Sequence, residues 1–169
     1  TTDISTNGRD PDPNGDGNPN QPGDNVPTFL VLDTPGSDLE LTIDHFGDPS
    51  AVGNIFDSFL IVRNVGTTPT NGPITVVYHL PPSVRVLPAA DMQPFGTGWA
   101  CRATERVVVC TYDRPVPPGR EISVTVWQEI LQVVPELTST ASVFYAGDAN
   151  PANDTGSDRC VPAGCGRVR

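Results

Sequence analysis

The order of apolar and polar positions along the chain predicts short β-strands separated by turns. Residues 38–44 alternate strictly between apolar and polar side chains, and residues 56–63 alternate again, as half-buried strands do. Similar β-rich runs lie at 28–32, 74–80, 84–87, 98–101, 106–112, 120–127 and 140–145. The nearest approach to a helix is 129–137, which Pro135 interrupts. The pattern predicts an all-β protein, an immunoglobulin-like β-sandwich of about seven strands with an extended N-terminal arm.

The apolar residues are unevenly distributed, and this sets the expected domain limits. Residues 1–27 contain only Ile4, Val26 and prolines as apolar residues, and the last 24 residues are nearly as poor. We therefore expect an arm at 1–37, a sandwich domain at 38–155 and a C-terminal tail at 156–169. No stretch of about 18 apolar residues predicts a membrane span. No leader peptide is recognisable, as expected of a mature or a cytosolic chain.

The charge is strongly acidic. Twenty Asp and Glu residues oppose ten basic ones, for a net charge of −10, which argues against a nucleic-acid partner because phosphate binding needs a basic surface. All ten basic residues are Arg. Without Lys, the chain cannot form Lys–Asn isopeptide bonds or be joined to another subunit through a lysine. Any assembly between subunits is expected to use noncovalent contacts or disulfides.

The four cysteines form two local pairs. If 101–110 is a hairpin that turns at Glu105-Arg106, the register places Cys101 opposite Cys110 in a non-hydrogen-bonded pair, where strands lie closest and a disulfide fits. A second disulfide is expected between Cys160 and Cys165, where it would close the tail. Neither pair has the spacing of zinc ligands. Two disulfides predict an oxidising compartment and an extracellular, cell-surface location.

The N-terminal segment 10–18, with the sequence DPDPNGDGN, places side-chain oxygens at alternate positions and a glycine at the sixth. Calcium loops begin in this way, although the twelfth position is Gln21 rather than a bidentate Glu, and the prolines exclude flanking helices. The alternative is a solvated acidic linker. The expected calcium ligands are Asp10, Asp12, Asn14, Asp16, Asn18 and Asp24.

Several short motifs follow one another in an order that resembles a known family. They are DLEL at 38–41, NVG at 64–66, LPPSV at 80–84, VPPG at 116–119 and DANPAND at 148–154. Together they resemble the repeat named "domain of unknown function eleven", a β-sandwich found in tandem in prokaryotic cell-surface proteins. Pro82, Ser83 and Asp154 depart from its usual pattern. The resemblance covers about residues 38–155. It implies an extracellular structural or adhesive role without catalytic residues.

Two functions remain open at this stage. In the first, the chain is a subunit of a cell-surface fibre, a homopolymer in which the arm of one copy adds a β-strand to the open sheet edge of the next. The second is a calcium-stiffened adhesin or ligand-binding module. The β-prone residues of the arm that would serve as the added strand are Ile4, Phe29, Leu30, Val31 and Leu32.

Enzyme chemistry is the least supported alternative. The two histidines, His45 and His79, lie on separate expected strands with no nearby cluster of metal-ligand spacing, and no hydrolase or phosphate-loop motif occurs. Trp99 and Trp127 would serve as a sugar-binding platform only if they were exposed, whereas a strand Trp usually packs in a core. We therefore expect no catalytic residues.

Overall fold

The computed structural model describes residues 35–47, 49–87 and 96–161. The chain divides into two compact units, and the described residues belong to the second, which begins at Pro35. The expected arm residues up to position 34, including the calcium loop and the β-prone segments, lie outside the described residues.

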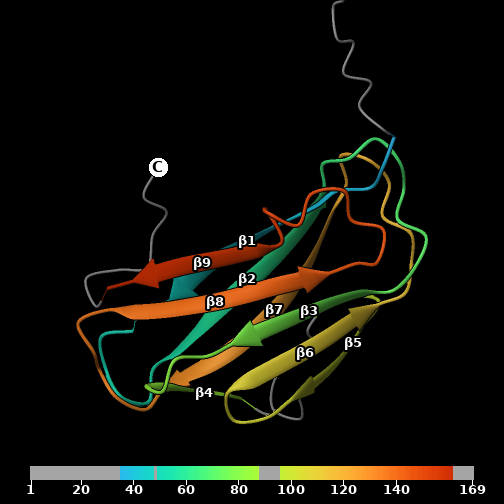
Figure 1. Cartoon of the computed structure of the whole chain (residues 1–169). Coiled ribbons are helices and arrows are strands. Elements are labelled where there is room, and N and C mark those ends of the chain that lie inside the picture. Colours follow the sequence, from blue (N-terminus) through green and yellow to red (C-terminus); the bar gives the residue numbers. More distant parts are fainter. Residues whose placement is uncertain (1–34, 48, 88–95, 162–169) are drawn as a thin grey trace, which may run out of the picture. The chain divides into compact units, whose positions relative to one another are not determined.

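In the described residues, nine strands form two antiparallel sheets that pack face to face, which confirms the predicted β-sandwich (Figure 1). One sheet has four strands in the order β1-β2-β7-β4, and the other has five in the order β5-β6-β3-β8-β9. The described residues contain no helix, including the segment 129–137. The strands are β1 Leu39–Gly47, β2 Ile55–Asn64, β3 Ile74–His79, β4 Val84–Val86, β5 Trp99–Ala103, β6 Val107–Tyr112, β7 Glu121–Ile130, β8 Leu137–Phe144 and β9 Thr155–Cys160.

The core follows from the alternation in the sequence. In β1, Leu39, Leu41 and Ile43 are buried while the residues between them are more exposed, because successive side chains of a strand point to opposite faces. The inner face of the other sheet contributes β-branched and aromatic residues such as Val76 and Tyr78, both fully buried. Apolar burial between the two inner faces is the main stabilising contribution to such a sandwich.

The structure differs from the sequence-based limits at the C-terminal end. Residues 155–160 form β9, which pairs with β8 from Leu137↔Cys160 to Ser142↔Thr155, where we expected a tail from residue 156. The sequence TGSDRC gave little indication of a strand, because its inward positions are Gly156, Asp158 and Cys160 rather than large apolar residues. Strand β8 likewise begins at Leu137, earlier than expected.

The loop between β2 and β3 explains why the NVG motif has its composition. The buried Asn64 donates its amide N–H groups to the carbonyls of Thr68 and Val116, both at 2.8 Å, and its Oδ1 accepts from the N–H of Gly66 at 3.0 Å. A Cβ on Gly66 would lie 2.4 Å from the carbonyl oxygen of Gly36, so only glycine fits without a backbone shift. The motif therefore connects the segment before β1, the β2–β3 loop and the β6–β7 loop.

Candidate functional site

The two lateral sides of the sandwich differ, and this difference locates the candidate functional surface. We call the side formed by residues 35–41, the loop 145–154 and β9 the closed side. We call the side formed by β4 and the β5–β6 hairpin the open side. The edge strands β4 and β5 each pair with a neighbour on one flank, and within the described part of the chain no strand pairs with the other flank.

The closed side is joined by hydrogen bonds between distant parts of the sequence. Asp148 accepts the backbone N–H of Leu39 at 2.8 Å through one carboxylate oxygen and that of Asn150 at 2.8 Å through the other. The N–H of Leu41 donates to the carbonyl of Asn153 at 3.1 Å. Ser37 forms a parallel bridge with Asp148. These contacts satisfy the backbone groups of β1 that would otherwise face solvent.

The closed side also brings three carboxylates into one region. Burial raises the pKa of Asp154 to about 6, and repulsion from Asp148 and Asp38 adds to this effect. The Oδ1 atoms of Asn153 and Asp154 are buried without a hydrogen-bond partner. Among the described residues, however, no group of three or more His, Cys, Asp or Glu side chains is arranged to hold a metal ion.

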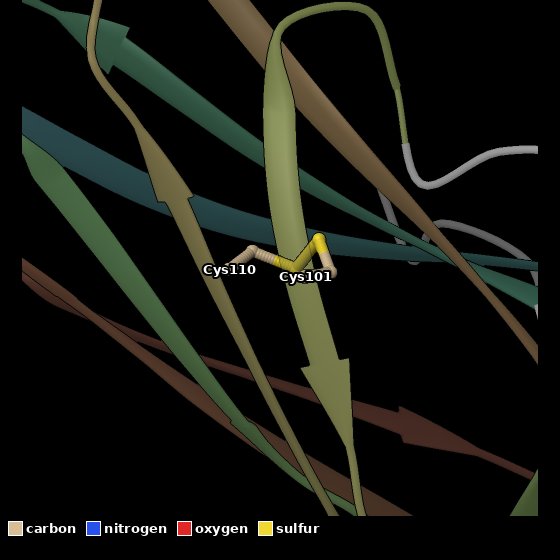
Figure 2. Close-up of a disulfide and its surroundings, with 2 residues drawn as sticks. All are labelled: Cys101 and Cys110. Carbon is tan, nitrogen blue, oxygen red and sulfur yellow. A yellow bond between two sulfur atoms is a disulfide. The ribbon is translucent and has the colours of Figure 1, made fainter.

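The open side contains the predicted disulfide hairpin. Cys101 lies opposite Cys110 in the register that the sequence predicted, and the two form a disulfide with Cα atoms 4.1 Å apart. Figure 2 shows the sulfur bridge crossing between the two strands. The turn is closed as expected, because the N–H of Thr104 donates to the carbonyl of Val107 at 2.8 Å. Cys160 is described, whereas Cys165 is not, so the second predicted pairing remains a prediction.

Two hollows flank this hairpin. The first, about 390 Å³, lies on its outward face, where side chains alternate with the inward disulfide. Its lining residues are Ala100, Cys101, Arg102, Val109 and Thr111. The second, about 350 Å³, lies between β4 and the hairpin turn and is lined by Val84, Arg85, Val86, Glu105, Arg106 and Leu131. Both hollows combine aliphatic side chains with arginine.

The tryptophans do not form a joint platform in this arrangement. Trp99 is half-buried and stacks at a tilt on Tyr112 with ring centroids 5.1 Å apart, packed against the core. Trp127 is also half-buried, but it lies between the inward residues Val126 and Gln128 and so faces outward from its sheet. The expectation that a strand Trp packs in the core therefore fits Trp99 and not Trp127.

A buried polar cluster crosses the sandwich, and the sequence analysis missed it. His45 Nδ1 lies 2.5 Å from Asp158 Oδ2, and only 1% of the histidine side chain is exposed. Nearby, Ser58, Tyr78 and Gln128 are fully buried and hydrogen-bonded to one another. His45 and Asp158 are 113 residues apart, and no local spacing could have indicated their contact. The other histidine, His79, is exposed at the end of β3.

Comparison with known proteins supports the fold and does not identify a family. No family model matches the chain, and the search of curated proteins finds no match, so the resemblance noted in the sequence remains a prediction. Among solved structures, a cohesin module from a Clostridium perfringens family 33 glycoside hydrolase superimposes with a TM-score of 0.51 at 9% identity, covering 76% of this chain and 97% of the module.

Two further structures belong to the same group of immunoglobulin-like sandwiches. The bacterial hydrophobin BslA matches with a TM-score of 0.50 at 14% identity, covering 75% of this chain and 95% of BslA. A collagen-binding domain from a Staphylococcus aureus adhesin gives 0.47 at 11% identity, covering 70% and 96% of the two chains. At such low identity the likenesses to the cohesin module and to BslA support the immunoglobulin-like β-sandwich fold alone. No helix in the described residues is long and apolar enough to cross a membrane.

Proposed function

We propose that this chain is an extracellular, non-catalytic recognition module, an adhesin-type sandwich that binds an extended polypeptide along its open side. The observation that carries the proposal is the outward hollow on the β5–β6 hairpin, beside the free flank of β5 and held in place by the Cys101–Cys110 disulfide. An extended ligand would bond to the unpaired backbone of β5 and place a side chain in the hollow.

The chemistry of this surface favours recognition. The hollow presents Val109, with 38% of its surface exposed, next to the guanidinium-bearing Arg102. An aliphatic contact beside an arginine suits a polypeptide with an apolar side chain and a nearby carboxylate. The disulfide supports an oxidising, extracellular setting. Only 1% of the His45 side chain is exposed, so an external substrate has no access to its imidazole.

Binding to immobilised fibrillar collagen, fibronectin and fibrinogen, measured by biolayer interferometry, tests the proposal. Val109→Asp combined with Arg102→Glu should abolish binding to whichever of these polypeptides the unaltered protein binds. The matched control is Val65→Asp, because Val65 is similarly exposed at 41% and does not line either hollow. Equal loss in both variants, or binding to none of the three, would argue against this surface as a polypeptide site.

A fibre subunit is the second candidate, favoured by the free flanks of β4 and β5. The arm of a neighbouring copy, with Ile4 or Phe29, Leu30, Val31 and Leu32, would add to one of these flanks. Deleting residues 1–34, and thus keeping Gly36 and Ser37 for the closed side, should leave a folded monomer that forms no fibres. Fibres of the truncated chain in electron micrographs would exclude this role without affecting the recognition proposal.

Calcium binding by the arm is also a proposal. The support is the oxygen spacing of Asp10, Asp12, Asn14 and Asp16, with Asn18 and Asp24 beyond. The missing Glu at the twelfth position predicts a dissociation constant on the order of 10⁻⁴ M. Isothermal titration of the whole chain should show heat that Asp12→Ala removes. Unchanged heat in that variant would place the ion elsewhere.

A further inference from the structure

The buried polar cluster contains a hydroxyl and a carboxamide, the two groups that an acyl-transfer reaction needs. Both belong to the chain itself, so the reaction needs no external substrate. Ser58 on β2 and Gln128 on β7 are each 0% exposed. The Gln128 Nε2 donates a hydrogen bond to the Ser58 Oγ. A hydroxyl thus lies directly beside the C–N bond of a carboxamide, in a site from which solvent is excluded.

We propose that Ser58 and Gln128 form an intramolecular ester that links β2 to β7 covalently. The Ser58 oxygen attacks the side-chain carbonyl carbon of Gln128, an O–C bond forms, and the C–N bond breaks. The serine proton passes to the departing nitrogen, which leaves as ammonia. This ester-forming step requires no oxidant and no cofactor. The hydroxyl has to rotate from the edge of the amide to its face, which a change of the Ser58 rotamer provides.

Tyr78 is placed to stabilise the charge that develops on the carbonyl oxygen. Its hydroxyl lies 2.9 Å from the Ser58 Oγ and 3.4 Å from the Gln128 Oε1. Burial raises the pKa of Tyr78, so the phenol stays protonated and can donate to the developing oxyanion. Hydrogen-bond donors aimed at such an oxygen, within a dry site, are among the largest contributions to acyl transfer.

The His45–Asp158 pair supplies a base next to the serine. Asp158 accepts from Nδ1 at 2.5 Å, which leaves the lone pair on Nε2, and Nε2 is buried without a hydrogen-bond partner. His45 lies directly opposite Ser58 in the register of β1 and β2, and both side chains face inward. Cross-strand partners have Cβ atoms about 5 Å apart, so a rotation of the Ser58 side chain can bring its hydroxyl proton to the Nε2 of His45. His45 is a positioning and proton-transfer residue in this scheme.

The same burial that permits the reaction would preserve its product. Water that could hydrolyse an ester is excluded from the site, since Ser58, Tyr78 and Gln128 are all fully buried. The bond would give this lysine-free chain a covalent link between the two central strands of its four-stranded sheet. This inference is independent of the open side and of any ligand there.

Intact mass spectrometry of the full chain tests the inference. Ester formation releases ammonia, so the oxidised protein should weigh about 17 Da less than its sequence requires. Asn–Gly pairs at 7–8, 14–15 and 71–72 can lose ammonia by forming succinimides, and the mass alone is therefore insufficient. Tandem mass spectrometry must find a peptide that joins Ser58 to Gln128. A full-mass protein, or a loss mapped to an Asn–Gly pair, would mean a hydrogen-bonded network only and would overturn the proposal.

Amino-acid variants distinguish loss of the ester from loss of the folded structure. Ser58→Ala should restore the full mass, whereas Ser139→Ala, which alters the other buried serine that bonds to Tyr78, should keep the loss. In His45→Gln the loss should appear about 100-fold more slowly in freshly made protein, while circular dichroism remains that of the folded sandwich. If Ser58→Ala does not fold, Gln128→Leu provides the same test, because an aliphatic side chain of similar size has no acyl group. A cross-linked peptide that persists without the His45 imidazole at an unchanged rate would remove histidine from the scheme.

Discussion

The closed and open sides of this sandwich treat their edge strands in opposite ways. Each side ends in two edge strands, and each edge strand has one flank that is not paired with another strand. On the closed side, polar residues of the loop 145–154 occupy the flank of β1, and the Asp148 carboxylate accepts the Leu39 N–H at 2.8 Å. On the open side, a single disulfide holds the hairpin while the flanks of β4 and β5 stay unoccupied within the described residues. Backbone groups that are satisfied within the chain contribute stability, and those left available can contribute binding.

The two sides also differ in the range of their contacts. The Asp148–Leu39 bond joins residues 109 positions apart, whereas the disulfide joins residues separated by nine. Glycine permits the close approach on the closed side, where a Cβ on Gly156 would lie 2.9 Å from the carbonyl oxygen of Leu41. We therefore expect the closed side to unfold only with the whole domain and the open side to tolerate local opening.

The largest effect is expected at Asn64, whose Oδ1 also accepts the N–H of Asp38 on the closed side at 3.4 Å. Asn64→Ala removes the two bonds that its amide donates and the acceptor for the Gly66 N–H, although the Val116 carbonyl still accepts from the Thr70 N–H at 3.2 Å, so the unfolding free energy should fall by about 3 kcal/mol. Chemical denaturation measures this loss. Asn64→Asp retains the Oδ1 acceptor for Gly66 but turns a carboxylate oxygen toward two carbonyls in a fully buried position, so at pH 7 it should cost at least as much as alanine. If the alanine variant loses under about 1 kcal/mol, water has replaced these bonds and the closed side is weaker than we infer.

The disulfide should contribute less, and its contribution should be local. Replacing Cys101 and Cys110 together by alanine removes a constraint on a short loop, worth about 2–3 kcal/mol in unfolding free energy. Hydrogen exchange should accelerate in β5 and β6 and remain slow in β1 and β9. Equal acceleration in both pairs would show that the two sides open together, and the contrast between them would fail.

The sequence predicts the open side better than the closed side because of this difference in range. The register that pairs Cys101 with Cys110 could be counted outward from one two-residue turn, and the structure confirms it. The strands with strict alternation, such as β2 from Ile55 to Asn64, were also recognisable, since apolar periodicity reports burial directly.

The closed side could not be predicted from local sequence patterns. Strand β9 has the sequence TGSDRC and is held by its pairing with β8 and by contacts with β1, so its strand character comes from tertiary structure rather than propensity. The contact of His45 with Asp158 is equally invisible to local patterns, because the two residues meet only when β1 and β9 are in place. The NVG motif is visible in the sequence, but the close approach of Gly36 to Gly66 that explains it arises only in the folded chain.

A smaller effect is expected from the carboxylates of the closed side. The pKa of Asp154 is about 6 in the folded protein against 3.8 for an ordinary aspartate, so the folded state binds this proton more tightly than the unfolded state does. The contribution of Asp154 to stability is therefore most favourable below pH 3.8 and is lost as the pH rises through about 6. Asp154→Asn should remove this dependence and stabilise the protein at pH 7 by about 1 kcal/mol, after allowance for solvent screening. Melting temperatures of both proteins from pH 4 to 8 measure this, and parallel curves would contradict it.

The smallest effect on stability is expected on the open side, at the ion pair between Arg85 and Glu129. The Arg85 Nε donates to the Glu129 Oε2 at 2.8 Å, but the arginine side chain is 55% exposed, and such pairs contribute about 0–1 kcal/mol. Arg85→Ala should therefore leave the unfolding free energy within about 0.5 kcal/mol of the original. The same residue lines the hollow beside β4, so a polypeptide or arm that occupies this hollow should bind several-fold more weakly to the variant. A stability loss above about 2 kcal/mol would mean that Arg85 holds the edge of the sheet rather than presenting it, and the open side would then resemble the closed one.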